Sequence, residues 1–189
     1  KDSLPGRLFN MITRTVTIFV RALRECKSGD AILVVTNPPL LPFAAALVAS
    51  LKRCSMVILI HDVYPEVLVA SSLVAPSASI VKISAWLNRA LYNRSKRIIT
   101  LGRDMTELVK AKLQARNHDR VRCIPNWAEN EIVRPVKRTE NRLLNRLGLQ
   151  DKFVVLYAGN LGRTHGIEYL AAAAQALQGS SIHFLVLGF

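Results

Sequence analysis

Residues 31–62 decide the fold, and they read AILVVTNPPLLPFAAALVASLKRCSMVILIHD. Two short apolar runs without polar alternation, at 31–36 and 56–60, flank a longer apolar stretch at 43–51. Runs of this kind are typical of strands that are covered on both faces, and the longer stretch has the length of a helix. The segment therefore predicts a strand, a helix and a second strand, which is the repeating unit of a parallel sheet.

The same alternation continues on both sides of this segment. Before it, apolar residues recur at helical spacing from Leu8 to Leu23. After it, we expect helices at 81–93 and 104–115, and strands at 97–100 and 120–124. Because strands that alternate with helices are joined by right-handed crossovers, the sequence predicts an α/β domain with a parallel sheet.

A change of pattern after residue 126 marks a domain boundary. The stretch 127–138 has no periodicity, contains Pro135 and carries charges of both signs. The elements expected beyond it are a helix at 139–147 ended by Gly148, a strand at 153–158, a helix at 167–177 and a strand at 182–187. We therefore predict two doubly wound, Rossmann-like domains, one at 1–133 and an incomplete one at 134–189. Since the chain opens without Met and stops directly after a strand, we expect it to be a segment of a longer protein.

Composition narrows the class of protein. The chain has 189 residues, of which 50% are hydrophobic, and this content excludes a disordered chain. The longest apolar stretch, 40–51, contains a proline and ends at Lys52, so it is too short to span a bilayer. Lys and Arg number 26 against 13 acidic residues, which gives a formal net charge of +13. Such a surface attracts anions, whether nucleic acid, phospholipid headgroups or phosphorylated small molecules.

The three cysteines predict neither a disulfide framework nor a zinc site. Cys26, Cys54 and Cys123 are widely spaced and form no CxxC pattern. Because Cys54 and Cys123 border apolar strands, we expect buried thiols in a reducing compartment.

Candidate sites lie beyond the carboxyl ends of the predicted strands, where open parallel sheets bind their ligands. These places are Thr36-Asn37-Pro38-Pro39, His61-Asp62, Pro125-Asn126 and the turn from Gly159 to Gly166. A His at a strand end can act as a base or a hydrogen-bond donor near neutral pH. The alternative is that Asp62 caps the next segment while His61 packs or is solvated. His118 and His183 lack partners at ligand spacing, and we interpret both as structural or exposed.

The turn from Gly159 to Gly166 has the features of a phosphate site. Glycines after a buried strand let the backbone approach a ligand, and the start of the next helix offers free N–H groups. Arg163 and His165 add side-chain donors. The spacing of Gly159, Gly162 and Gly166 matches neither G-x-G-x-x-G nor a Walker loop, so the glycines alternatively serve only a tight turn.

The stretch 67–103 contains no Asp or Glu. Its basic residues include Lys82, Arg89, Arg94, Lys96 and Arg97. Its helix also has a broad apolar surface with Trp86 and Tyr92. A basic amphipathic helix with aromatic residues indicates contact with an anionic membrane, and the alternative is a core helix with a basic outer face. The absence of acids favours the membrane.

Several motifs resemble one family. They are VVTNPPLLP (34–42), ILIHDVYPE (58–66), RIITLGRDMTELV (97–109), IPNW (124–127), NRLLNRLGLQDKFVVLYAGN (141–160) and FVVLYAGNLGRTHGIEYL (153–170). Together they resemble the retaining GT-B glycosyltransferases of family 4, in particular the branch that builds bacterial surface polysaccharides such as O-antigen, capsule and colanic-type polymers. The resemblance covers the chain from about Asp30 to Phe189.

The resemblance implies transfer of a sugar from a nucleotide-sugar to an acceptor with retention of the anomeric configuration, without a metal ion or other cofactor. The implied catalytic residues are His61 and Asp62. The implied donor-binding residues are Gly159, Asn160, Gly162, Arg163, His165 and Gly166, and the implied acceptor or cleft residues are Thr36, Asn37, Pro38 and Asn126. The implied partners are a nucleotide-sugar donor, a lipid-linked or saccharide acceptor and an anionic membrane, on the cytoplasmic inner face.

The chain departs from the family pattern in two respects. Many members carry Arg after the first glycine and Lys before the last, where this chain has Asn160 and His165, and Arg163 is a substitute cation. The family's donor-binding E-x7-E segment would lie beyond Phe189, so we expect residues 1–189 to be inactive alone. The rival interpretations are another GT-B-like enzyme such as a sugar epimerase and a basic nucleic-acid-binding module. The few aromatic residues and scattered basic residues argue against nucleic acid.

Overall fold

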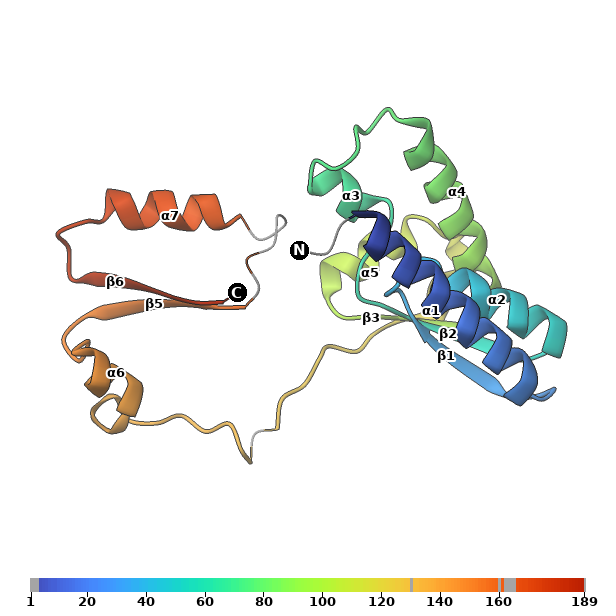
Figure 1. Ribbon diagram of the computed structural model, residues 1–189. Coiled ribbons are helices and arrows are strands. Elements are labelled where there is room, and N and C mark those ends of the chain that lie inside the picture. Colours follow the sequence, from blue (N-terminus) through green and yellow to red (C-terminus); the bar gives the residue numbers. More distant parts are fainter. Residues whose placement is uncertain (1–3, 130, 160, 162–165, 189) are drawn as a thin grey trace. The chain divides into compact units, whose positions relative to one another are not determined.

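The chain divides after Asn126 into two units, residues 1–126 and 127–189, each with its own parallel sheet (Figure 1). The structure, a computed structural model, describes residues 4–129, 131–159, 161 and 166–188. The division lies at the start of the aperiodic stretch 127–138, and the boundary expected at 133 lies inside that stretch.

The first unit contains four parallel strands in the order β1-β2-β3-β4. The strands are β1 (Ala31–Val35), β2 (Ser55–Ile60), β3 (Arg97–Thr100) and β4 (Val121–Cys123). The helices are α1 (Leu4–Glu25), α2 (Leu41–Lys52), α3 (Glu66–Ala70), α4 (Ser79–Arg94), α5 (Arg103–Lys110) and the 3-10 helix η1 (Ala115–Arg120). Each strand pairs with the next one along the chain, so right-handed crossovers place α2, α4 and α5 over one face of the sheet.

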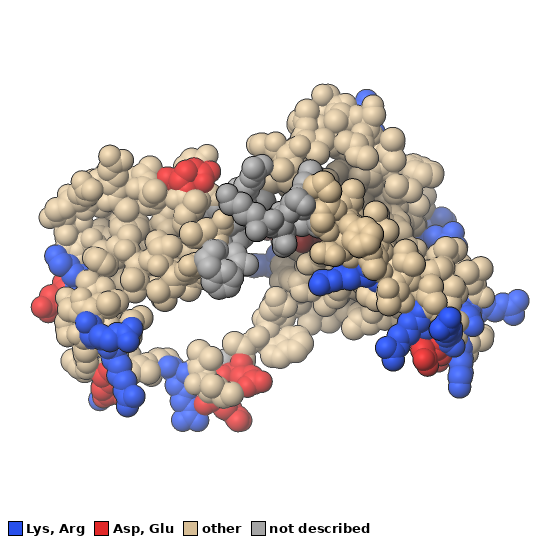
Figure 2. Space-filling model, in the orientation of Figure 1, with Lys and Arg blue, Asp and Glu red and all other residues tan. Residues whose placement is uncertain are grey.

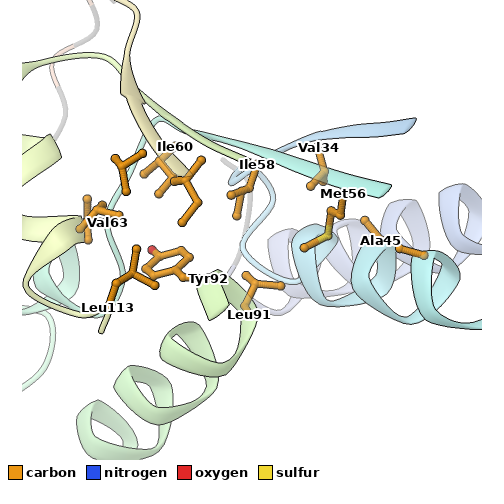
Figure 3. Close-up of a cluster of buried hydrophobic side chains, with 13 residues drawn as sticks. Val34, Ala45, Met56, Ile58, Ile60, Val63, Leu91, Tyr92 and Leu113 are labelled. Carbon is orange, nitrogen blue, oxygen red and sulfur yellow. The ribbon is translucent and has the colours of Figure 1, made fainter. Parts of the chain in front are cut away.

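That face forms the hydrophobic core of the first unit, because alternate residues of each strand point towards the helices. The core residues from the strands are Val34, Met56, Ile58, Ile60, Ile98 and Val121. Leu91 and Tyr92 of α4 pack against them (Figure 3). The opposite face is less covered, since Leu33 is 64% exposed. The expectation that the strands are covered on both faces is therefore correct for one face only.

The second unit contains a strand–helix–strand unit preceded by two short helices. Its elements are the 3-10 helix η2 (Arg138–Glu140), α6 (Arg142–Leu147), β5 (Phe153–Ala158), α7 (Ile167–Ala176) and β6 (Ile182–Leu187). β5 and β6 pair in parallel from Phe153↔Ile182 to Ala158↔Leu187. Asn141 caps α6 by accepting from the N–H groups of Leu143 and Leu144, and Gly148 ends it in the left-handed conformation. The predicted cap at Gly148 is confirmed.

The predicted fold class, α/β with parallel Rossmann-like sheets, is confirmed, whereas the bounds of two helices are wrong. The single helix expected at 139–147 is divided into η2 and α6, because Asn141 caps the start of α6. We expected a helix at 104–115, but α5 ends at Lys110. The next residues form turn bonds from Lys112 N to Val109 O and from Leu113 N to Lys110 O. The turn buries Leu113 in the core, so tertiary packing ends the helix there. Helix α3 was not predicted.

Candidate functional site

The candidate site of the first unit lies at the edge formed by the carboxyl ends of its strands. The register pairs Val35 of β1 with Leu59 of β2, and Ile60 of β2 with Thr100 of β3. The residues that follow these strands therefore meet along one edge of the sheet. Thr36, His61 and Asp62, which the sequence predicts as site residues, all lie on this edge.

Thr36 joins two of the loops at this edge. Its side chain is buried, with 5% of the residue exposed. Thr36 Oγ1 accepts hydrogen bonds from the backbone N–H of His61 at 3.0 Å and from that of Asp62 at 3.2 Å. Three predicted site residues are thus brought together, and the buried residue holds the backbone of the other two. His61 is exposed and Asp62 is half-buried.

An open cavity of about 370 Å³ lies beside the turn that follows β1. Its lining residues are Thr13, Arg14, Thr17, Ile18, Asn37, Pro38 and Leu41. Asn37 and Pro38 are predicted acceptor-side residues, and the cavity adds a cation from α1 that sequence reasoning did not assign to the site. The helical spacing of the polar residues in α1 indicates that Arg14 lies on an exposed face. This spacing does not distinguish Arg14 from the other residues on that face, so it could not assign Arg14 to the site.

A polar cluster behind the His61-Asp62 loop was also missed. Glu66, the first residue of α3, forms an ion pair of 2.5 Å with Lys112 Nζ. Within the described part of the chain, Glu66 Oε2 and Tyr92 Oη are buried without a hydrogen-bond partner. Burial, with a smaller contribution from Glu66, raises the pKa of the Tyr92 hydroxyl, which therefore stays protonated.

Tyr64 belongs to the same loop and responds to Asp62. Partial burial raises the pKa of the Tyr64 hydroxyl, and the carboxylate of Asp62 raises it further. Tyr64 is thus a neutral hydrogen-bonding group near a predicted catalytic carboxylate. The sequence signal was the motif ILIHDVYPE, in which both Tyr64 and Glu66 follow the predicted pair.

The candidate donor site of the second unit lies where β5 and β6 end. The N–H of Gly159 donates to Leu187 O at 2.9 Å. Gly188 lies so close to Gly159 that a Cβ added to Gly188 would be 2.3 Å from the Gly159 carbonyl oxygen. The two strand ends therefore require a glycine at 188, a position that sequence reasoning did not assign to the site.

Gly166 supplies the start of α7. It is the residue that precedes the helix, with φ 59° and ψ 36°, a conformation that favours glycine. The N–H groups of the first turn of α7 and the helix dipole form the part of the predicted phosphate site that is described. Asn160, Gly162, Arg163 and His165, the other predicted donor-binding residues, lie outside the described residues.

The predicted residues thus fall into two sets, one in each unit, and Asn126 is the last residue of the first unit. Among residues 4–129, 131–159, 161 and 166–188, no group of three or more His, Cys, Asp or Glu side chains is placed to hold a metal ion. His118 is half-buried and His183 is exposed. The expectation of buried thiols is wrong for Cys123, which is exposed at the end of the short strand β4, and Cys26 and Cys54 are half-buried.

Comparison with known proteins decides the family. Residues 3–127 match the family described as the glycosyl transferase 4-like domain. The chain belongs to this family. Similarity extends through the second unit as well, since WbjE of Pseudomonas aeruginosa, assigned as a glycosyltransferase, is 30% identical over all 189 residues. WcaI of Escherichia coli (strain K12), assigned as a colanic acid biosynthesis glycosyl transferase, is 25% identical over 147 residues, 75% of this chain.

Solved structures that are similar to this chain have the same fold. Crystal structures of Anabaena Alr3699/HepE with UDP and glucose and with UDP cover 91% and 93% of this chain, with TM-scores of 0.64 and 0.66 and identities of 17% and 16%. The chain spans less than half of each relative, covering 46% of WbjE, 35% of WcaI and 42–43% of HepE.

Proposed function

We propose that the whole protein is a glycosyltransferase that moves a sugar from a nucleotide-sugar to an acceptor during the synthesis of a surface polysaccharide such as O-antigen or capsule. The observation that carries this proposal is the alignment of all 189 residues, through both units, with WbjE. The assignment of WcaI to colanic acid biosynthesis supports the polysaccharide class.

The proposed donor is a nucleotide-sugar held by the second unit. The HepE crystal structures contain UDP or UDP-glucose, and this supports a nucleoside diphosphate as the ligand. In this chain, the N-terminus of α7 offers N–H groups and a partial positive charge to the diphosphate. Arg163 and His165 are the proposed side-chain donors, and Gly159, Asn160, Gly162 and Gly166 let the backbone approach.

The proposed reaction retains the anomeric configuration and needs no metal ion or other cofactor. As the bond from the sugar to the diphosphate breaks, negative charge grows on the leaving phosphate. Preorganised N–H groups and cations stabilise that charge more in the transition state than in the ground state. His61 and Asp62 act beside the sugar and the acceptor hydroxyl, and Thr36 keeps their backbone in place.

The proposed acceptor is lipid-linked or a saccharide and contacts the first unit. The cavity beside Asn37 and Pro38 is open and combines polar side chains with the guanidinium of Arg14. A guanidinium forms charge-assisted hydrogen bonds with phosphates such as those that join a saccharide to its lipid carrier. Asn126 contributes to the acceptor side. A lipid-linked acceptor places the protein at the cytoplasmic inner face of the membrane as a peripheral protein.

The test uses the whole protein with Asp62→Asn and Arg163→Ala, and Asp119→Asn, an exposed carboxylate of η1, as the control. Calorimetry with UDP, GDP and their sugars measures donor affinity, and incorporation of labelled sugar into membrane lipid measures transfer. We expect Arg163→Ala to weaken nucleotide binding about 10-fold, because it removes a charge-assisted hydrogen bond. Asp62→Asn should lower transfer by about 100-fold while donor affinity is kept.

Three results contradict the proposal. One is unchanged turnover and donor affinity in both variants. Another is a nucleotide bound away from the turn between Gly159 and Gly166 in a crystal of the whole protein. The third is conversion of the donor sugar into an epimer without an acceptor, seen by NMR, which identifies an epimerase.

A further inference from the structure

The exposed side of α4 carries large apolar side chains in the first half of the helix. Ile80, Ile83 and Trp86 are 57%, 53% and 69% exposed, and Leu87 is also exposed. They are spaced three or four residues apart, so they share one side of the helix. Leu73, in the connection that precedes the helix, is exposed as well.

The second half of α4 supplies the contacts that hold the helix on the sheet. Asn88, Leu91 and Tyr92 are buried there. Asn88 donates to Ser84 O at 2.9 Å, so its amide is satisfied within the helix. The exposed apolar side chains are therefore not part of the core of the first unit.

Basic residues border the exposed apolar side chains on one side, and the stretch 67–103 has no acidic residue. Lys82 and Arg89 are exposed and lie seven residues apart, which places both on one border of the apolar strip, beside Trp86. No Asp or Glu occurs from 67 to 103. Figure 2 shows no acidic side chain over the connection between α3 and α4 or over the visible part of α4.

We propose that this side of α4, formed by Ile80, Ile83, Trp86, Leu87, Lys82 and Arg89 and named here the α4 surface, docks on an anionic lipid bilayer. Apolar side chains enter the boundary between headgroups and acyl chains, and a tryptophan is favourable at that depth. Lys82 and Arg89 at the border attract anionic headgroups. Within the described part of the chain no helix is long and apolar enough to cross a bilayer.

The place of α4 in the fold connects this surface with the candidate site. The chain leaves the carboxyl end of β2 through His61-Asp62 and α3, and α4 then runs back to the start of β3, where Lys96 N donates to Met56 O at 2.8 Å (Figure 1). The first half of α4 is thus on the side of the unit where the strands end. The functional link between the α4 surface and the candidate site rests on the proposed function, because docking there brings a lipid-linked acceptor towards His61 and Asp62.

The experiment measures partition of the whole protein onto vesicles of phosphatidylcholine with and without phosphatidylglycerol. We expect binding that needs the anionic lipid and weakens with salt. The double variant Lys82→Glu/Arg89→Glu should lower the partition coefficient by about 25-fold or more, because each basic residue contributes roughly 5-fold. The matched control is Arg142→Glu/Arg146→Glu, which reverses two exposed charges of α6 and should leave partition nearly unchanged.

A second measurement leaves the apolar strip nearly intact. Brominated lipids quench tryptophan fluorescence only at close range. Quenching should be lost in Trp86→Phe and kept in Trp127→Phe, which changes an exposed tryptophan of the second unit. UDP binding, measured on every variant, should not change, so a failure of the nucleotide-sugar proposal is seen separately from a failure of the α4 surface.

The proposal is overturned if Lys82→Glu/Arg89→Glu binds vesicles as the unchanged protein does, if the α6 control loses as much binding, or if quenching persists in Trp86→Phe. Salt-sensitive binding to duplex DNA without binding to vesicles also overturns it, because the α4 surface is then a nucleic-acid site.

Discussion

The substitution Thr36→Val tests how the candidate site of the first unit is held together. Valine keeps the shape of threonine but removes the hydroxyl that accepts from the N–H groups of His61 and Asp62, at 3.0 and 3.2 Å. Each such bond contributes about 1 kcal/mol, and an N–H left without a partner costs about 1–3 kcal/mol when water cannot reach it. Because His61 is exposed, water offsets part of this cost. We therefore expect a loss of about 1–2 kcal/mol, concentrated in this loop.

Amide hydrogen exchange of the whole protein measures this loss where it occurs. A loss of 1.4 kcal/mol corresponds to a tenfold change in an equilibrium constant, so the amides of His61 and Asp62 should exchange about 10-fold faster in Thr36→Val. The control is Thr36→Ser, which keeps the hydroxyl and loses a buried methyl group, so these two amides should stay protected. Equal protection in Thr36→Val and the unchanged protein would refute the role assigned to the Thr36 hydroxyl.

Three further predictions concern the rest of the molecule. A double-mutant cycle of Glu66→Gln and Lys112→Met, measured by urea unfolding, should give a coupling free energy of about 1–2 kcal/mol. This value lies between those of exposed and buried ion pairs, and a coupling free energy near zero contradicts a stabilising role for this pair. Gly188→Ala should destabilise the second unit by about 1–3 kcal/mol in thermal unfolding, because the new Cβ would lie 2.3 Å from Gly159 O. The control Gly179→Ala strains only its own backbone, since no other atom lies within 4 Å of the new Cβ, and should lower the stability less. Partial burial, with smaller contributions from Cys26 and Asp30, raises the pKa of the Cys54 thiol and so lowers its thiolate fraction at pH 8. Iodoacetamide should therefore label Cys54 more slowly than the exposed Cys123, and equal labelling rates in mass spectrometry contradict this prediction.

The strands and their parallel pairing could be predicted because each apolar run carries its own signal. The runs at 31–36 and 56–60 are continuous, bounded by turn residues and separated by a helix, so they predict strand, crossover and direction locally. The end of α5 could not be predicted in this way. It depends on the burial of Leu113 against residues distant in the sequence, and the apolar spacing continues past Lys110.

The site residues that could be predicted are likewise those with a local signal in the sequence. Thr36, His61 and Asp62 could be singled out because each follows a strand, and parallel strands bring their carboxyl ends together. The ion pair of Glu66 and Lys112 joins residues 46 positions apart, and no spacing rule predicts it. The need for glycine at 188 likewise arises only when β6 pairs with β5 and its end meets Gly159.

Two buried threonines at the ends of strands explain why the carboxyl edge of the first unit presents fixed loops. Thr36 follows β1 and accepts from the loop after β2. Thr100 ends β3, and its hydroxyl lies 2.6 Å from that of Thr106 on α5. Thr106 in turn donates to Gly102 O at 2.8 Å, so the loop between β3 and α5 is closed by side chains. Both residues are β-branched, a shape that is favourable in and next to strands, and both turn a hydroxyl towards polar groups of a neighbouring segment. Because both threonines are buried, the hydroxyl of Thr36 holds the backbone of His61 and Asp62, and that of Thr100 contacts α5, without occupying the exposed edge of the sheet.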